Sequence, residues 1–186
     1  MSVWEALRKI VFALDSAGIP YMLTGSFAST YYGVTRSTQD IDLVIAPTPD
    51  QLRIFVESLP SDAYYADLDA AQEALSHQSL FNVLDLGSGW KFDLIIRKAR
   101  AFSEEEFRRR QLVKIRDLPI YVASAEDVVL SKLEWSKQGK SRRQVEDVSA
   151  ILKIAWEYLD QSYLEIWIRD LGIEEQWQEA RLAAGV

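Results

Sequence analysis

The sequence contains no cysteine, a single histidine and no apolar run that approaches membrane-spanning length. Without cysteine there is no disulfide and no thiolate metal site, and His77 has no cysteine or second histidine with which to bind a metal. We expect no membrane partner. We also expect no signal peptide, because the N-terminal stretch carries Glu5 and Asp15 and has helical periodicity. These absences fit a protein of the reducing cytoplasm.

Basic residues are outnumbered, since 21 Lys and Arg stand against 28 Asp and Glu and the formal net charge is −7. This balance argues against general nucleic-acid binding. The acidic excess is concentrated at the end, because residues 157–186 hold seven acidic and two basic residues. Residues 97–116 carry eight basic residues against three glutamates, so a local contact surface for RNA or phosphate stays an open alternative.

The 186 residues, 48% of them hydrophobic, are enough for one core with a helical appendage. Apolar periodicity predicts strands and helices up to residue 123 and only helices from Ser124 onward. No linker rich in proline, glycine or serine separates these parts, so we expect domains 1–123 and 124–186 to pack together. The predicted fold class is α/β (α+β), a mixed β-sheet flanked by helices and followed by a C-terminal helical segment.

Strands are expected at residues 21–24, 41–46, 80–84 and 90–96, with a hairpin or bent strand across 113–115 and 120–122. Helices are expected at residues 3–17, 26–32, 50–58 and 67–76, from residue 103, and at 124–137, 142–157, 161–171 and 174–183. Residues 60–66 are predicted to form a loop.

Asp40 and Asp42 stand at the start of a predicted strand. Strand residues alternate between faces, so both carboxylates lie on one face while Ile41 points into the core. Two adjacent carboxylates repel each other, and a divalent cation removes that repulsion. Hard oxygen ligands suit Mg²⁺ (or Mn²⁺) shared with substrate phosphates. The alternative is a solvated carboxylate pair.

Asp93 is the candidate third carboxylate, because it lies in the middle of an apolar strand where a lone charge is costly. If it faces the first two aspartates, it completes a metal site and helps to deprotonate an acceptor hydroxyl. The alternatives are a salt bridge with Lys91 or Arg97, or an exposed position on an open sheet face.

Gly25-Ser26, thirteen intervening residues and then Asp-x-Asp resemble the nucleotidyltransferase superfamily of the DNA polymerase β type. The form that runs from Gly25-Ser26 to Arg36-x-Thr38-x-Asp40-Ile41-Asp42 looks most like the AbiEii/AbiGii branch, the toxins of abortive-infection systems, and its uncharacterised relatives. The resemblance implies a nucleotidyltransferase-like sheet in which the Gly-Ser turn holds the triphosphate and the aspartates hold the metal.

The same resemblance implies that Ser26 donates a hydrogen bond to the β- or γ-phosphate, although an ordinary helix N-cap is compatible with the sequence. Arg36 and Thr38 match the Arg-x-Thr-x-Asp pattern of the branch. Arg36 then contacts phosphate or braces the metal loop, and a surface arginine is the alternative.

Lys132 and Asp147 resemble the third and fourth motifs of the toxin branch, on helices that close over the nucleotide. Lys132 would neutralise the triphosphate, and Asp147 would orient Lys132 or contact the nucleotide. The alternative is an ion pair between helices. We expect an exposed Lys132 whose replacement leaves the stability nearly native.

The resemblance implies a Mg²⁺-dependent enzyme that moves an NMP from an NTP to an acceptor hydroxyl. The acceptor is the 3′ end of a tRNA, as in the toxin branch, or a hydroxyl on a protein or small molecule, and a cognate antitoxin is an expected partner. The alternatives are a nucleotidyltransferase-fold binding module without activity and an antitoxin-like nucleotidyltransferase that modifies a partner protein.

Overall fold

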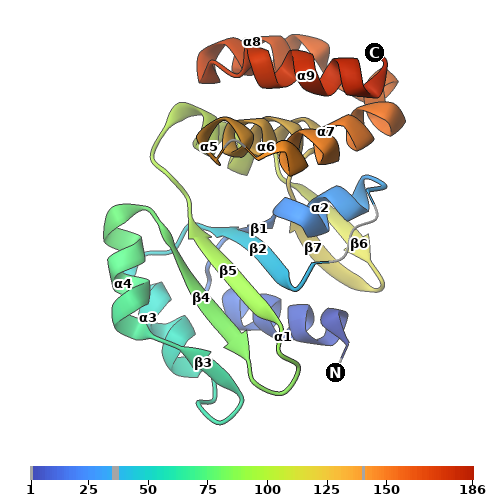
Figure 1. Ribbon diagram of the computed structural model, residues 1–186. Coiled ribbons are helices and arrows are strands. Elements are labelled where there is room, and N and C mark those ends of the chain that lie inside the picture. Colours follow the sequence, from blue (N-terminus) through green and yellow to red (C-terminus); the bar gives the residue numbers. More distant parts are fainter. Residues whose placement is uncertain (1, 35–37, 140) are drawn as a thin grey trace. The chain divides into compact units, whose positions relative to one another are not determined.

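The structure is a computed structural model that describes residues 2–34, 38–139 and 141–186 (Figure 1). Its helices are α1 (Val3–Ser16), α2 (Gly25–Tyr31), α3 (Pro49–Ser58), α4 (Leu68–His77), α5 (Ala101–Arg108), α6 (Ala125–Gly139), α7 (Arg142–Ala155), the 3₁₀ turn η1 (Trp156–Tyr158), α8 (Gln161–Leu171) and α9 (Glu174–Ala184). Its strands are β1 (Tyr21–Leu23), β2 (Asp40–Ile45), β3 (Tyr64–Ala66), β4 (Leu80–Asp85), β5 (Lys91–Ile96), β6 (Gln111–Ile115) and β7 (Leu118–Val122).

The chain divides into two compact units. The sheet unit comprises Met1–Thr24 and Thr38–Val122, and the helical unit comprises Gly25–Ser37 and Ala123–Val186. The division into domains 1–123 and 124–186 stays a prediction. It differs from these two units chiefly in α2, which the sequence assigns to the sheet part and the structure groups with the later helices.

The sheet unit contains one seven-stranded sheet in the order β3-β4-β5-β2-β1-β7-β6. β2 pairs with β5 and β1 pairs with β7 in parallel, and the other neighbouring pairs are antiparallel. This mixed sheet confirms the predicted fold class. Two antiparallel hairpins, β4-β5 and β6-β7, also form where the sequence places them.

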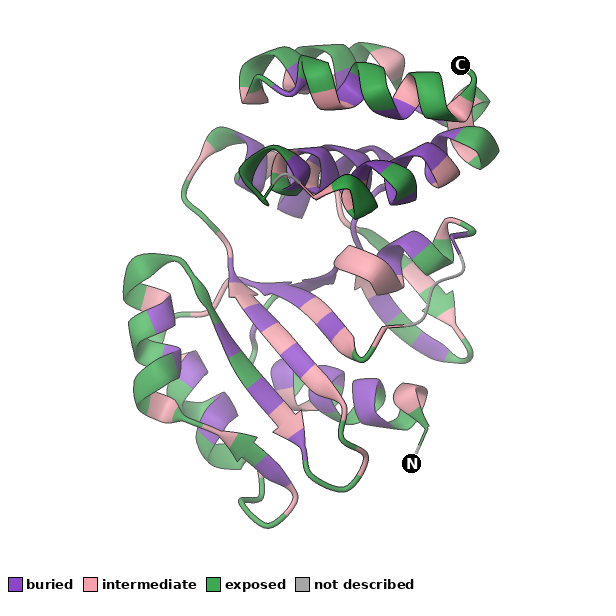
Figure 2. Cartoon of the chain, viewed as in Figure 1, coloured by how far each residue is buried: buried purple, intermediate pink, exposed green. Residues whose placement is uncertain are grey.

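The two central strands β2 and β5 bury one face and leave the other partly open. Ile41 and Leu43 on β2, and Phe92 and Leu94 on β5, are fully buried. Asp42 and Asp93, which lie between these residues, are half-buried, and Figure 2 shows the alternation along β5 and along the first half of β2. The strand period of two therefore separates a core face from a face that carries charged side chains.

Helices α1, α3 and α4 support the sheet unit, and contacts run from α1 to α3, from α3 to α4 and from α4 to β4. α1 buries a stripe of Leu7, Ile10 and Leu14 at helical spacing. Its first turn is closed by a reciprocal capping box between Ser2 and Glu5, which satisfies backbone donors that the helix leaves unpaired.

The helical unit is built from α2 and α6–α9. α6 contacts α2, α7, α8 and α9, and α7 packs along α9. Gly33 follows α2 with a φ of 96°, and a Cβ at this position would lie 2.8 Å from Cδ1 of Ile154 on α7. Glycine therefore ends this helix for two reasons, its left-handed backbone and its close approach to a neighbour.

One strand was not predicted. Residues 60–66 were expected to be a loop, but Tyr64–Ala66 form β3 at the edge of the sheet, where it pairs with β4. Three residues are too few to show a period of two, so the pairing with β4 rather than local sequence defines this strand.

Candidate functional site

The predicted carboxylates of the sheet unit lie on two adjacent parallel strands. In the register of β2 with β5, Asp40 is opposite Lys91 and Asp42 is opposite Asp93. Since opposed residues of paired strands share a face, all four side chains belong to the face opposite the fully buried Ile41. The sheet therefore gathers three acidic groups and one basic group on a single surface.

Lys91 joins two of these carboxylates. Its Nζ lies 3.1 Å from Oδ1 of Asp40 and 3.3 Å from Oδ1 of Asp93. The hydrogen bond to Asp40 is the main cause of a raised pKa of the Lys91 ammonium. The salt bridge between Lys91 and Asp93, which the sequence left open as an alternative, is thus present. This salt bridge explains how the Asp93 carboxylate is tolerated in an apolar strand, and it is compatible with a catalytic role for Asp93.

Two neighbours fix the orientation of the acidic side chains and backbone. Asn82 on β4 is opposite Asp93, and its Nδ2 donates a 2.6 Å hydrogen bond to Oδ1 of Asp93. Thr38 accepts from the backbone N–H of Asp40 and donates to the carbonyl of Asp40, each at 3.2 Å. Thr38 therefore holds the entry to β2, while Asn82 holds Asp93.

In the part of the chain that the structure describes, no group of three His, Cys, Asp or Glu side chains is arranged to hold a metal ion. Lys91 instead supplies the positive charge between Asp40 and Asp93. The donor types nevertheless fit a hard divalent cation, because three carboxylates on one sheet face offer oxygen ligands with excess negative charge. The metal role of Asp40, Asp42 and Asp93 stays a prediction.

The Gly25-Ser26 pair opens α2, where the chain passes from the sheet unit into the helical unit. Gly25 has a φ of 62°, a backbone conformation that favours glycine. The hydroxyls of Ser29 and Thr30 donate to the carbonyls of Gly25 and Ser26 at 2.9 and 3.0 Å. The turn is thus braced from within the helix. Arg36 lies outside the described residues.

α2 is also tied to the beginning of α6 inside the helical unit. The hydroxyl of Tyr32 donates to the carbonyl of Ala123 at 2.7 Å. Burial of the Tyr32 hydroxyl raises its pKa above the usual range. A buried neutral phenol that satisfies a backbone carbonyl stabilises the position of α2 on this unit.

Lys132 and Asp147 meet in the helical unit. Lys132 Nζ on α6 lies 2.8 Å from Oδ2 of Asp147 on α7 and donates to Oε1 of Gln144 at 3.2 Å. The side chains of Lys132 and Asp147 are only 6% and 9% exposed. The expectation of an exposed Lys132 is therefore wrong. The near-native stability expected on its removal rested on that exposure, and a buried pair predicts a loss of stability instead. Its role toward a nucleotide stays a prediction.

The sequence prediction missed a second buried network at the start of α6. Asp127 is fully buried, and its two carboxylate oxygens accept from the hydroxyls of Ser124 and Tyr163, each at 2.6 Å. The Ser-x-x-Asp spacing is typical of a helix cap, but it gives no sign of Tyr163, which lies 36 residues further on. Lys91 and Asn82 were also missed as site residues, although alternation in the predicted hairpin places both on the face of Asp93.

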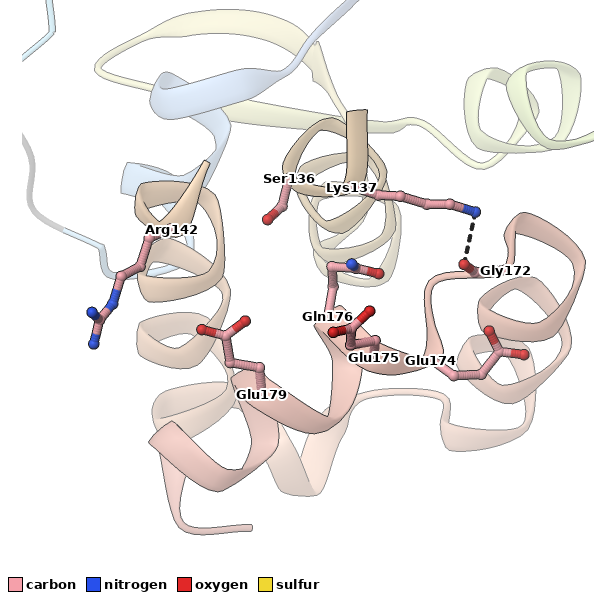
Figure 3. Close-up of a pocket in the computed structure, with 8 residues that line it drawn as sticks. All are labelled: Ser136, Lys137, Arg142, Gly172, Glu174, Glu175, Gln176 and Glu179. Atoms are coloured by element: carbon pink, nitrogen blue, oxygen red, sulfur yellow. Dashed lines mark hydrogen bonds between the residues drawn. The ribbon is translucent and has the colours of Figure 1, made fainter. Parts of the chain in front are cut away.

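A polar pocket of about 790 Å³ lies in the helical unit, and its lining includes none of the predicted site residues. Figure 3 shows the glutamates of α9 around it and the 2.8 Å hydrogen bond from Lys137 to the carbonyl of Gly172. Its lining is Ser136, Lys137, Arg142, Gly172, Glu174, Glu175, Gln176 and Glu179.

Among the described residues, no helix is long and apolar enough to cross a membrane.

The family model described as "Nucleotidyltransferase of unknown function (DUF6036)" matches residues 3–183. None of the curated proteins matches the chain. A solution structure of the antibiotic-resistance factor ANT(2'')-Ia is similar to the chain with a TM-score of 0.55, 16% identity, and coverage of 95% of this chain and 92% of that chain.

A crystal structure of ANT(2'')-Ia in complex with adenylyl-2''-tobramycin has a TM-score of 0.55 and 16% identity, over 92% of this chain and 97% of that one. An antigenic nucleotidyltransferase-like protein from Paracoccidioides brasiliensis has a TM-score of 0.53 and 17% identity, over 92% of this chain and 89% of that one. Similarity at these identities establishes the fold.

Proposed function

The chain belongs to this family of nucleotidyltransferases of unknown function, and from that premise we propose that it transfers a nucleoside monophosphate from an NTP to an acceptor hydroxyl with Mg²⁺ (or Mn²⁺). The observation that carries the proposal is the register of β2 with β5, which sets Asp42 opposite Asp93 on the face that also holds Asp40. Nucleotidyl transfer needs little covalent chemistry from the protein beyond positioned charge.

In the proposed reaction, the acceptor oxygen forms a bond to the α-phosphorus, the bond from that phosphorus to its bridging oxygen breaks, and pyrophosphate leaves. Asp40, Asp42 and Asp93 would hold the cation, which when bound supplies positive charge against the developing negative charge. Asp93 would also accept the proton of the acceptor hydroxyl, and its bond from Asn82 keeps one carboxylate oxygen oriented for these tasks.

Gly25, Ser26, Arg36, Thr38 and Lys132 are the proposed nucleotide-binding residues. The bracing of the Gly25-Ser26 turn by hydroxyls of α2 supports a preorganised phosphate contact. Thr38 would contribute to the same site by fixing the backbone of Asp40 through its two hydrogen bonds.

The AbiEii/AbiGii toxin branch is the finer assignment that we propose. It is supported by the 2.8 Å contact of Lys132 with Asp147, because that branch pairs a lysine helix with an aspartate helix. Asp147 would hold the ammonium of Lys132 in place, and both would act as catalytic residues toward the triphosphate. On this assignment a tRNA 3′ end is the acceptor and a cognate antitoxin is a partner.

The test is transfer of label from each of the four NTPs, radiolabelled at the α-phosphate, to total tRNA, total cell protein and a panel of small hydroxyl compounds that includes tobramycin. We include a small-molecule arm because one structural neighbour is ANT(2'')-Ia in complex with adenylyl-2''-tobramycin. We expect label on one acceptor class with wild-type protein and none with Asp42→Asn. Equal labelling by both proteins, or no labelling of any acceptor, would overturn the proposal.

A further inference from the structure

We infer that Lys91 is a resident counter-ion of the sheet carboxylates and makes divalent-cation binding depend on the nucleoside triphosphate. This inference rests on the proposed function, because it concerns the same site. The structural basis of the inference is that Lys91 Nζ lies 3.1 Å from Oδ1 of Asp40 and 3.3 Å from Oδ1 of Asp93.

The charges on this face explain why such a counter-ion is needed. Asp40, Asp42 and Asp93 lie on one face of two adjacent strands, and Lys91 is the residue opposite Asp40 in the register. Without a cation, like charges at this spacing repel each other. Lys91 relieves that repulsion between two of the three carboxylates and keeps them near each other.

The ion pairs of Lys91 with Asp40 and Asp93 are exposed enough to be broken when a ligand binds. The side chains of Lys91, Asp40 and Asp93 are 39%, 49% and 17% exposed, and ion pairs in contact with solvent are worth little. The backbone of Lys91 is held in the sheet by its neighbours, so only its flexible side chain has to move. Asp93 keeps its hydrogen bond from Asn82 when the ammonium departs.

The consequence is a coupling between cation and nucleotide. A cation that binds alone must displace Lys91 from two carboxylates, and the ammonium loses both ion pairs. A cation that arrives with a triphosphate also brings phosphate oxygens with which the displaced ammonium can pair. The two ligands therefore favour each other's binding, and Lys91 is a positioning residue that carries part of this coupling.

The experiment measures Mn²⁺ binding by the electron paramagnetic resonance signal of free Mn²⁺, with and without a non-hydrolysable NTP analogue. We compare the wild type with Lys91→Met, which removes the charge, and Lys91→Arg, which keeps it. Lys98→Met, at an exposed lysine just beyond β5, is the matched control. Asp42→Asn shows whether the bound Mn²⁺ belongs to this site.

We expect Lys91→Met to bind Mn²⁺ alone roughly 3- to 30-fold more tightly than the wild type, as the loss of two weak competing ion pairs allows. Lys91→Arg and Lys98→Met should stay within about twofold of the wild type. The analogue should tighten Mn²⁺ binding by a larger factor in the wild type than in Lys91→Met. Circular dichroism of each variant confirms that it is folded.

The failures can be told apart. If Lys91→Met binds Mn²⁺ no more tightly than the wild type, while Asp42→Asn abolishes binding, the counter-ion inference is overturned and the proposed metal site survives. If no variant binds Mn²⁺ with or without the analogue, or if Asp42→Asn binds like the wild type, the metal role of the proposed function is overturned together with the inference.

Discussion

Two lysine–aspartate contacts, one in each unit, differ in burial far more than in distance. Lys91 lies 3.1 Å from Asp40 in the sheet unit, and Lys132 lies 2.8 Å from Asp147 in the helical unit. The first pair is 39% and 49% exposed, whereas the second is 6% and 9% exposed. Solvent reaches both side chains of the first pair, whereas the second pair is largely shielded from solvent.

This difference separates two uses of the same chemistry. A pair in contact with solvent contributes little to stability, so its members are free to exchange partners with a ligand. A buried pair is costly to desolvate and even more costly to break, because removal of one partner leaves an uncompensated charge. We therefore expect substitutions in the sheet pair to change ligand binding with little effect on stability, and substitutions in the helical pair to reduce stability in addition to their proposed effect on activity.

The largest expected effect is on activity, from Asp42→Asn in the sheet unit. Asparagine matches aspartate in volume and removes one charged ligand, so label transfer should fall by at least about a hundredfold. The free energy of unfolding, measured in urea, should change by less than about 0.5 kcal/mol because the side chain is only half-buried. Full activity would remove the carboxylate from the proposed site, and a large loss of stability would break the contrast between the units.

The next effect is on stability, from Lys132→Met in the helical unit. Methionine keeps most of the volume of lysine and leaves the Asp147 carboxylate buried without this cation. We expect the free energy of unfolding to fall by about 3–5 kcal/mol, measured by urea denaturation.

Two further variants decide whether lost charge pairing causes this fall. Lys153→Met changes an exposed lysine on α7 and should stay within about 0.5 kcal/mol of the wild type. Lys132→Met combined with Asp147→Leu removes both charges and should recover much of the loss. A single variant as stable as the wild type would show that the pair does not behave as a buried one.

The sequence predicts the site residues of the sheet unit only in part. Alternation along one strand is a local property, so the shared face of Asp40 and Asp42 follows from the sequence. The position of Asp93 opposite Asp42 needs the pairing of β2 with β5, 51 residues apart, which no local pattern specifies.

Lys132 is harder still to predict. Its helix places it beside Val128 and Leu133, which are buried, yet a lysine ordinarily reaches solvent from such a position. Its burial becomes tolerable through partners on α7, among them Asp147, which lies 15 residues further on. A resemblance in motif identified the pair, whereas its environment depends on how α6 packs against α7.

A third test asks whether burial, rather than the unit, decides the response of a titratable group. Burial, with a contribution from Asp15, raises the pKa of Tyr21 in the sheet unit to about 12. Above about pH 10 the unfolded chain loses this proton while the folded chain keeps it, so stability falls as pH rises. Tyr21→Phe should lessen that fall by about 1–2 kcal/mol between pH 10 and pH 12.

The same direction holds for Tyr32 in the helical unit, where burial is again the main cause of a raised pKa. Tyr32→Phe should lessen the alkaline loss in the same way, after a cost of about 1 kcal/mol at neutral pH for its hydrogen bond to Ala123. Urea denaturation across the alkaline range measures both. If only one of the two tyrosines contributes to the alkaline loss of stability, burial alone does not determine the response, and the unit in which the tyrosine lies also affects it.

The smallest expected effect completes the comparison of the two lysines. Lys91→Met is the same change as Lys132→Met at a similar contact distance, but in a half-exposed pair. We expect it to alter the free energy of unfolding by less than about 1 kcal/mol. Because salt screens exposed charges and hardly reaches buried ones, about 0.5 M NaCl should erase this small difference and leave the deficit of Lys132→Met in place. A large, salt-resistant loss in the free energy of unfolding of Lys91→Met would mean that the sheet unit needs Lys91 beside its carboxylates in order to fold. In that case Lys91 could not be displaced by a cation.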